Sequence, residues 1–155
     1  MKRKTFCLFA AIAVACLSVS VLASCVGRNV GLESAEAIAE RIWNLSKFRP
    51  DGFTVDVRSL EMPTEGIAVA YLATQGCHSR EDLTAVVRHA LEHGGYVGGW
   101  YDSVSGIYFF DSTCLFPEDQ LEEALRFARA NNQLAVYILS TCEEIRLDQQ
   151  MPAAA

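Results

Sequence analysis

Residues 79–111 read SREDLTAVVRHALEHGGYVGGWYDSVSGIYFFD and predict a helix that is followed directly by a β-hairpin. Ser79 and Asp82 have the spacing of a capping box at the helix start, and Gly94-Gly95 is typical of a helix end. Between these signals, apolar residues recur every three or four positions and form one stripe. The stretch ends in two strand-like runs, at residues 96–101 and 107–111.

The same order of helix, strand and strand is predicted on both sides of this unit. The second strands of the first two units both begin with Gly-Ile, which supports an internal repeat of three units. The first unit is expected as a helix from Ser34 to Phe48 and strands at 53–58 and 67–74. The third is expected as a helix from about Pro117, a strand at 134–139 and a possible partner at 144–147.

The predicted fold class is α+β, with two layers. A helix that joins two strands of one sheet makes them parallel, whereas a tight turn makes them antiparallel. We therefore expect a mixed sheet of about six strands. Each helix has a single apolar stripe, so three helices should cover one face of the sheet. Residues 34–147 should form one domain, and residues 148–155, which carry no pattern, a disordered tail.

The charge of the chain argues against nucleic acid as a partner. Its formal charge is −6, and loss of Lys2, Arg3 and Lys4 with a cleaved leader would leave ten basic and 19 acidic residues, a charge of −9. Binding to a phosphate backbone needs a basic surface, and so does electrostatic attachment to anionic lipid. Any membrane attachment should therefore be hydrophobic.

The N-terminus has the features of an export signal. A basic start, MKRK, precedes a long apolar run that ends in Leu22-Ala23-Ser24-Cys25. These four residues resemble the lipobox of bacterial lipoproteins. The resemblance covers residues 1–25 only and implies that residues 1–24 are removed and that Cys25 becomes lipidated. Residues 25–33 would then be a short spacer beside the membrane, and the lipid would anchor the domain.

Two other interpretations of the leader remain open. An ordinary signal peptidase could cut after Val21-Leu22-Ala23 and release a soluble domain. Alternatively, the apolar run could remain as a transmembrane anchor. All three interpretations export the domain. Val26 follows Cys25 without an acidic residue. By resemblance to known lipoprotein sorting, this favours the periplasmic face of an outer membrane.

One motif in the second helix suggests a metal site. His89, Glu92 and His93 have the order H-x-x-E-H, which resembles inverted zinc metallopeptidases over five residues. The simpler interpretation is that two histidines lie near a helix C-terminus, where cations favour the dipole. No third ligand is evident, so we expect neither stoichiometric zinc nor any other cofactor. A thiol nucleophile, Cys114 paired with His93, is a further possibility.

Three cysteines follow strand-like runs of the mature chain. The predicted strand directions place Cys114, Cys142 and His93 at one edge of the sheet and Cys77 at the other. An exported protein meets an oxidising compartment, so a Cys114–Cys142 disulfide is a candidate, with Cys77 left free. The alternative is three reduced cysteines that pack as small apolar side chains.

The predicted hairpin is rich in aromatic residues. Gly98-Gly99 could allow a ligand to approach the backbone closely, so the hairpin is a candidate binding surface. If the aromatic side chains alternate instead, half would belong to the core. The candidate residues are Tyr96, Trp100, Tyr101 and Tyr108.

The preferred function is a lipid-anchored, non-enzymatic domain that binds a protein or small molecule. A small zinc or thiol hydrolase near His93 and Cys114 is the first alternative. A structural protein of the cell envelope is the second.

Overall fold

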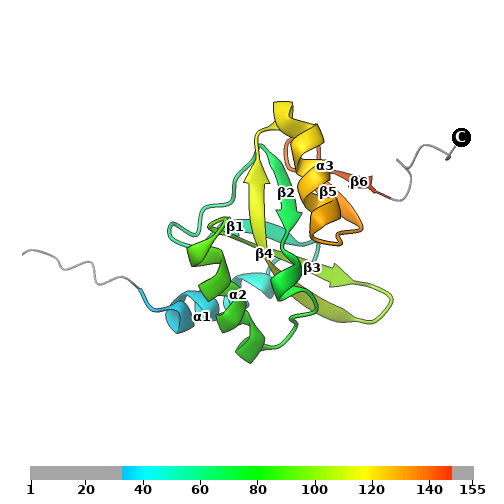
Figure 1. Ribbon diagram of the computed structural model, residues 1–155. Coiled ribbons are helices and arrows are strands. Elements are labelled where there is room, and N and C mark those ends of the chain that lie inside the picture. The colour runs from blue at the N-terminus through cyan, green and yellow to red at the C-terminus, as the bar shows by residue number, and fades with distance from the viewer. Residues whose placement is uncertain (1–32, 148–155) are drawn as a thin grey trace, which may run out of the picture. The chain divides into compact units, whose positions relative to one another are not determined.

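The computed structural model describes residues 33–147 (Figure 1). The leader, Cys25, most of the spacer and the tail at 148–155 lie outside the described residues. Along the chain the order of helix, strand and strand occurs three times, as predicted. The elements are α1 (Ala35–Ser46), β1 (Phe53–Asp56), β2 (Ile67–Ala70), α2 (Arg80–Glu92), β3 (Tyr96–Asp102), β4 (Ile107–Phe116), α3 (Leu121–Ala130), β5 (Ala135–Ile138) and β6 (Glu143–Arg146), with short 3₁₀ turns η1 (Leu72–Thr74) and η2 (Glu118–Gln120).

The fold is α+β, as predicted, with one six-stranded sheet in the order β1-β3-β4-β2-β5-β6. Every pair of neighbouring strands is antiparallel, so the prediction of a mixed sheet is wrong. Helices α2 and α3 each connect two strands that run in the same direction. However, β4 lies between β2 and β3, and β2 lies between β4 and β5. Each crossover therefore skips one strand, and no parallel pair forms among the described strands.

Strand β4 is the longest strand and holds the two halves of the sheet together. Its first seven residues pair with β3 and its last four with β2. The sequence predicted a strand end at Asp111, whereas β4 continues to Phe116. The polar residue Ser112 can lie within the strand because the Thr74 hydroxyl accepts a hydrogen bond from its backbone N–H at 2.8 Å.

All three helices cover one face of the sheet, as predicted. The register places alternate residues of each strand on that face, among them Val55, Val97, Val69 and Val136. Helices α1 and α2 bury their apolar stripes on β1, β3 and β4, whereas α3 packs over β2 and β5 (Figure 1). The core thus consists of two clusters, one under α1 and α2 and the other under α3.

The helix ends follow the signals in the sequence. The Ser79 hydroxyl accepts from the Asp82 N–H at 3.0 Å, and the Asp82 carboxylate accepts from the Ser79 N–H at 3.1 Å. Beyond the end of α2, Gly95 adopts a φ of +82°, and its N–H donates to the Ala90 carbonyl at 2.8 Å. A glycine is suited to this left-handed backbone because it has no Cβ.

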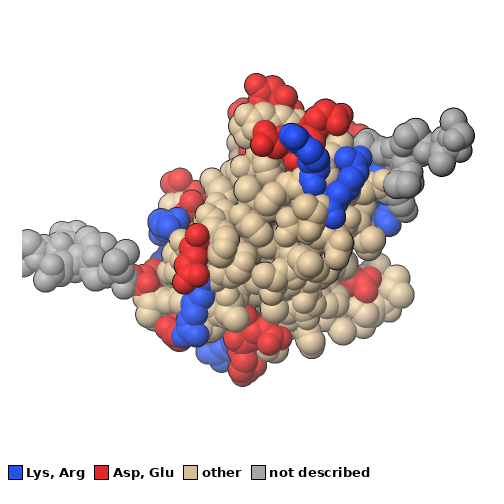
Figure 2. All heavy atoms as spheres, viewed as in Figure 1, with Lys and Arg blue, Asp and Glu red and all other residues tan. Residues whose placement is uncertain are grey.

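Exposed charged side chains connect two of the helices at the surface. Ion pairs Arg80–Glu40 and Arg88–Glu36 connect α2 to α1. They are exposed, so they add little stability. On the face shown in Figure 2, basic side chains stand beside acidic ones and do not gather into a basic patch.

Within residues 33–147, the structure contains no helix with the length and apolar character needed to cross a membrane.

Candidate functional site

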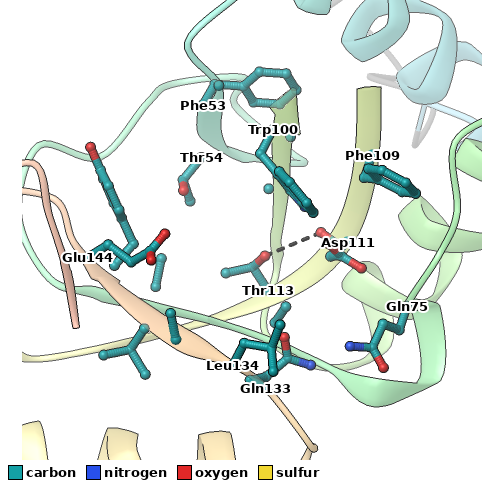
Figure 3. A pocket seen from close by; sticks show the side chains of 18 of the residues that line it. Phe53, Thr54, Gln75, Trp100, Phe109, Asp111, Thr113, Gln133, Leu134 and Glu144 are labelled. Carbon is teal, nitrogen blue, oxygen red and sulfur yellow. Dashed lines mark hydrogen bonds between the residues drawn. The ribbon is translucent and has the colours of Figure 1, made fainter. Parts of the chain in front are cut away.

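The face of the sheet that carries no helix is hollowed into a groove of about 640 Å³. We call it the open-face groove; all six strands contribute to its lining (Figure 3). The sheet register explains the hollow, because four residues that face it from the inner strands are small. Bulkier side chains stand around them. The small residues are Ala68, Ala70, Gly98 and Ala135.

Two aromatic side chains form one wall of the groove. Trp100 of β3 and Phe109 of β4 are paired in register, and their rings stack with centroids 5.1 Å apart. The Trp100 residue is 49 % exposed. The groove therefore offers an aromatic surface that water can reach. Flat apolar surfaces of this kind bind rings, methyl groups or cations.

The structure divides the four predicted aromatic candidates between the two faces of the sheet. Tyr96 and Trp100 lie on the open face by register. Tyr101 and Tyr108 lie on the helical face. The Tyr108 hydroxyl donates to the Arg49 carbonyl at 2.9 Å, and burial raises the pKa of Tyr108 to about 12. Tyr108 is therefore part of the packed structure rather than of a binding surface.

Asp111 lies in the groove, close to the two aromatic rings. Burial raises the pKa of its carboxyl group from 3.8 to about 6, and a hydrogen bond with the Trp100 side chain partly opposes that rise. Its Oδ1 atom is excluded from solvent and has no hydrogen-bond partner among the described residues. A buried polar atom without a partner destabilises a fold, so its presence calls for an explanation.

The charged side chains that line the groove carry more negative than positive charge. Its charged lining residues are three acids and one base: Asp51, Asp111, Glu144 and Arg146. Glu144 and Arg146 form an ion pair at 3.2 Å on β6. Gln75 and Gln133 add neutral amides that can donate or accept hydrogen bonds.

The H-x-x-E-H motif, the low-ranked candidate for a zinc site, lies in α2 on the helical face, and its histidines do not converge on one metal position. The imidazole rings of His89 and His93 stack with centroids 3.9 Å apart and an interplanar angle of 7°. The Nδ1 of His93 donates to the His89 carbonyl at 2.8 Å. Stacked rings do not direct two nitrogen atoms at one metal ion. Among residues 33–147, no three His, Cys, Asp or Glu side chains form a metal-binding group.

Cys114 is close to this cluster, but its surroundings do not activate the thiol. Its Sγ atom is hydrogen-bonded to the Tyr71 side chain and to the Leu115 backbone. Burial nevertheless raises the pKa of Cys114. The pKa of Tyr71 is raised to about 12, chiefly by burial. A nucleophilic cysteine needs a lowered pKa, because the thiolate is the reactive form. The Nδ1 of His89, in turn, lies 2.9 Å from the Ser112 hydroxyl.

The candidate Cys114–Cys142 disulfide is not formed, and Cys77, Cys114 and Cys142 are all free thiols. Because β4 is longer than predicted, Cys114 lies within the strand, paired with Val69, and not at the sheet edge. Cys142 lies in the turn between β5 and β6, and strands β2 and β5 intervene. Two strand spacings alone amount to about 10 Å, which exceeds the reach of a disulfide.

Asp111 was not predicted as a site residue. Its position after the apolar run IYFF suggested a strand end, where an acidic residue needs no function. A signal was nevertheless present in the alternation of β2, which reads IAVA. Small residues at alternate positions indicate a strand with one low, unfilled face.

The comparisons with protein-family models, curated proteins and solved structures found no match to this chain.

Proposed function

We propose that this chain is an exported, lipid-anchored domain that binds a small ligand in the open-face groove and has no catalytic role of its own. The observation that carries the proposal is the arrangement of Trp100, Phe109 and Asp111. An exposed aromatic wall stands beside a buried carboxyl oxygen for which residues 33–147 provide no partner, on the sheet face that the helices leave open.

The size and lining of the groove favour a small molecule over a protein partner. Sites for small ligands are typically concave, mostly apolar, and about 300–1,000 Å³ in volume, with a few polar groups that orient the ligand. The groove has about 640 Å³. A protein partner would instead be expected to use a flatter and larger surface.

The alternative function, hydrolysis at the helical face, has less support. A thiol mechanism requires an activated cysteine, whereas burial raises the pKa of Cys114. A zinc mechanism requires convergent ligands, whereas the rings of His89 and His93 stack on each other. A structural envelope role would leave the unpartnered oxygen of Asp111 unexplained.

The anchoring part of the proposal depends on the leader sequence alone. The lipobox-like residues Leu22-Ala23-Ser24-Cys25 support export and lipidation of Cys25, with the domain on the periplasmic face of an outer membrane. The spacer is short, so a membrane-anchored domain would bind ligands close to the lipid surface.

The groove proposal is tested by NMR with isotope-labelled protein that begins at residue 26. The backbone amide spectrum is recorded with mixtures of small metabolites, each mixture at millimolar concentration. We expect concentration-dependent shifts at Trp100, Phe109 and Thr113, with none at His89 or Cys114. A Trp100→Ala variant should lose the response, and a Tyr101→Ala variant on the other face should keep it. Shifts confined to the helical face would overturn the proposal and favour the hydrolase.

A further inference from the structure

We infer that the ligand of the open-face groove carries a protonated amine, which binds between the carboxylate of Asp111 and the indole of Trp100. The inference depends on the proposed function, because it names the chemical class of the ligand for that same groove.

The charge balance of the groove is the first argument. Its charged lining residues are Asp51, Asp111, Glu144 and Arg146. Arg146 has Glu144 as its ion-pair partner. Burial and the Trp100 side chain set the pKa of Asp111, and no cationic residue contributes. The groove therefore has an excess of negative charge that a cationic ligand would neutralise. Such complementarity favours association and suppresses binding of anions.

The unpartnered oxygen is the second argument. Asp111 Oδ1 is excluded from solvent and accepts no hydrogen bond from the described residues. An ionised carboxylate in that position is unfavourable unless a donor reaches it. An ammonium group has three N–H donors and a full positive charge, so it provides both the missing hydrogen bond and the countercharge. A neutral hydroxyl would provide the hydrogen bond only.

The aromatic wall is the third argument. In Figure 3 the tip of the Trp100 indole points toward Asp111, so that a cation beside the carboxylate would also lie near the ring. Ammonium groups are attracted to the face of an indole, the most favourable ring for this contact. The Trp100 residue is 49 % exposed, and exposed side chains change rotamer within nanoseconds. A rotation of the indole about its side-chain bonds would open a path for a small donor to Oδ1, and the ring would remain beside the bound cation.

The test compares two probes of nearly equal shape, benzylammonium and benzyl alcohol. Each is titrated at pH 7.5 into the isotope-labelled domain while the indole N–H signals of Trp43 and Trp100 are followed by NMR. Trp43 packs against Phe110 in the core and serves as an internal reference. We expect a saturable shift of the Trp100 signal, with benzylammonium binding at least about tenfold more tightly than benzyl alcohol, because only the ammonium group carries a charge.

Two variants isolate the contribution of Asp111. Asp111→Asn keeps the shape of the side chain and removes its charge, and it should weaken benzylammonium binding by at least about tenfold. Asp119→Asn removes the same charge from the exposed turn η2 and should leave binding unchanged. The spectrum of each variant also reports whether it is folded.

Three outcomes would overturn the inference. They are equal binding of the two probes, retained binding in Asp111→Asn, and no shift at Trp100 with benzylammonium. Equal binding of both probes in the groove would leave the proposed binding function intact and exclude only the cationic ligand. Shifts at His89 or Cys114 in place of Trp100 would overturn both proposals.

Discussion

Asp111 occupies a position in which its ionised form is unfavourable. Burial raises the pKa of this carboxyl group to about 6 in the folded protein, from 3.8. Between about pH 4 and pH 6, Asp111 is therefore protonated to a greater extent in the folded state than in the unfolded state. Stability contributed by this group is present at low pH and is lost as the pH rises through that interval. The shift corresponds to about 3 kcal/mol.

The first prediction is that Asp111→Asn stabilises the folded domain at neutral pH. The amide keeps the shape and cannot ionise, so the free energy of unfolding at pH 7.5 should rise by about 1–3 kcal/mol. The difference from the parent protein should vanish near pH 4. Urea unfolding at pH 4, 5, 6 and 7.5 measures this, with Asp119→Asn as the exposed control. A variant that is less stable than the parent at pH 7.5 would show that the folded parent stabilises the ionised carboxylate of Asp111.

The second prediction concerns the reactivity of the three described cysteines. Cys142 is exposed, whereas Cys77 and Cys114 are partly buried and have raised pKa values. Iodoacetamide at pH 7.5 should therefore modify Cys142 first and Cys114 at least about tenfold more slowly. Peptide mass spectrometry over a time course measures the rates. Fastest modification at Cys114 would instead support a thiol-dependent enzyme.

At the scale of the element, the helices were predictable because their signals are local. Ser79, Asp82 and Gly95 lie within or beside α2 and determine its ends through contacts a few residues apart. The end of β4 was not predictable in this way. Ser112 reads as a turn residue, and it stays in the strand because Thr74 and His89, both distant in sequence, bind its polar groups.

The third prediction tests the helix cap. Ser79→Ala removes the hydroxyl that accepts from the Asp82 N–H, so it should lower the free energy of unfolding by about 1 kcal/mol. Ser103→Ala makes the same chemical change at an exposed site in the β3–β4 turn and serves as the control. Urea unfolding of the two variants under identical conditions measures the difference. Equal stabilities would mean that the cap contributes nothing.

The fourth prediction uses two adjacent glycines that face opposite sides of β3. A Cβ at Gly99 would lie 2.6 Å from the Phe53 ring and 2.9 Å from the Tyr108 ring. Gly99→Ala should therefore destabilise the fold by about 1–3 kcal/mol, as overpacking does. A Cβ at Gly98 meets only the Thr113 hydroxyl within 3 Å, so one hydroxyl has to shift rather than two rings. Gly98→Ala should cost less than about 1 kcal/mol. Thermal unfolding of both variants checks the order, and a reversed order would mean that β3 is placed with the wrong face inward.

At the scale of the whole molecule, the order of the elements and the one-sided helical layer were predictable, but the pairing of the strands was not. The apolar stripe of each helix fixes the number of layers. Pairing depends on contacts between distant segments, such as Ala70 with Thr113 and Ile67 with Ile138. The groove follows from that pairing, because Ala68 and Gly98 form one floor only when β4 lies between β2 and β3. The alternation of β2 therefore indicates one low strand face, but no local pattern places Gly98 beside it.

The fifth prediction concerns attachment of the whole protein to the membrane. The lipobox-like sequence predicts that radiolabelled palmitate enters the native protein and not the Cys25→Ser variant. The lipid is the expected anchor, so the variant should also leave the membrane fraction. Cys142→Ser removes an exposed cysteine elsewhere and should retain the label. Equal labelling of the native protein and Cys25→Ser would exclude this site of lipidation.

Strands β1 and β2 pair with strands that come later in the sequence, and this affects the order in which the chain can fold. Strand β1 pairs only with β3, and β2 pairs with β4 and β5, so the described chain up to residue 95 contains no strand pair. A chain that emerges N-terminus first from a ribosome or a translocation channel holds its first two strands unpaired until the segments after residue 96 appear. Contacts so distant in sequence slow folding. Such a chain forms no strand pair for most of its passage, and this is compatible with the export that we propose.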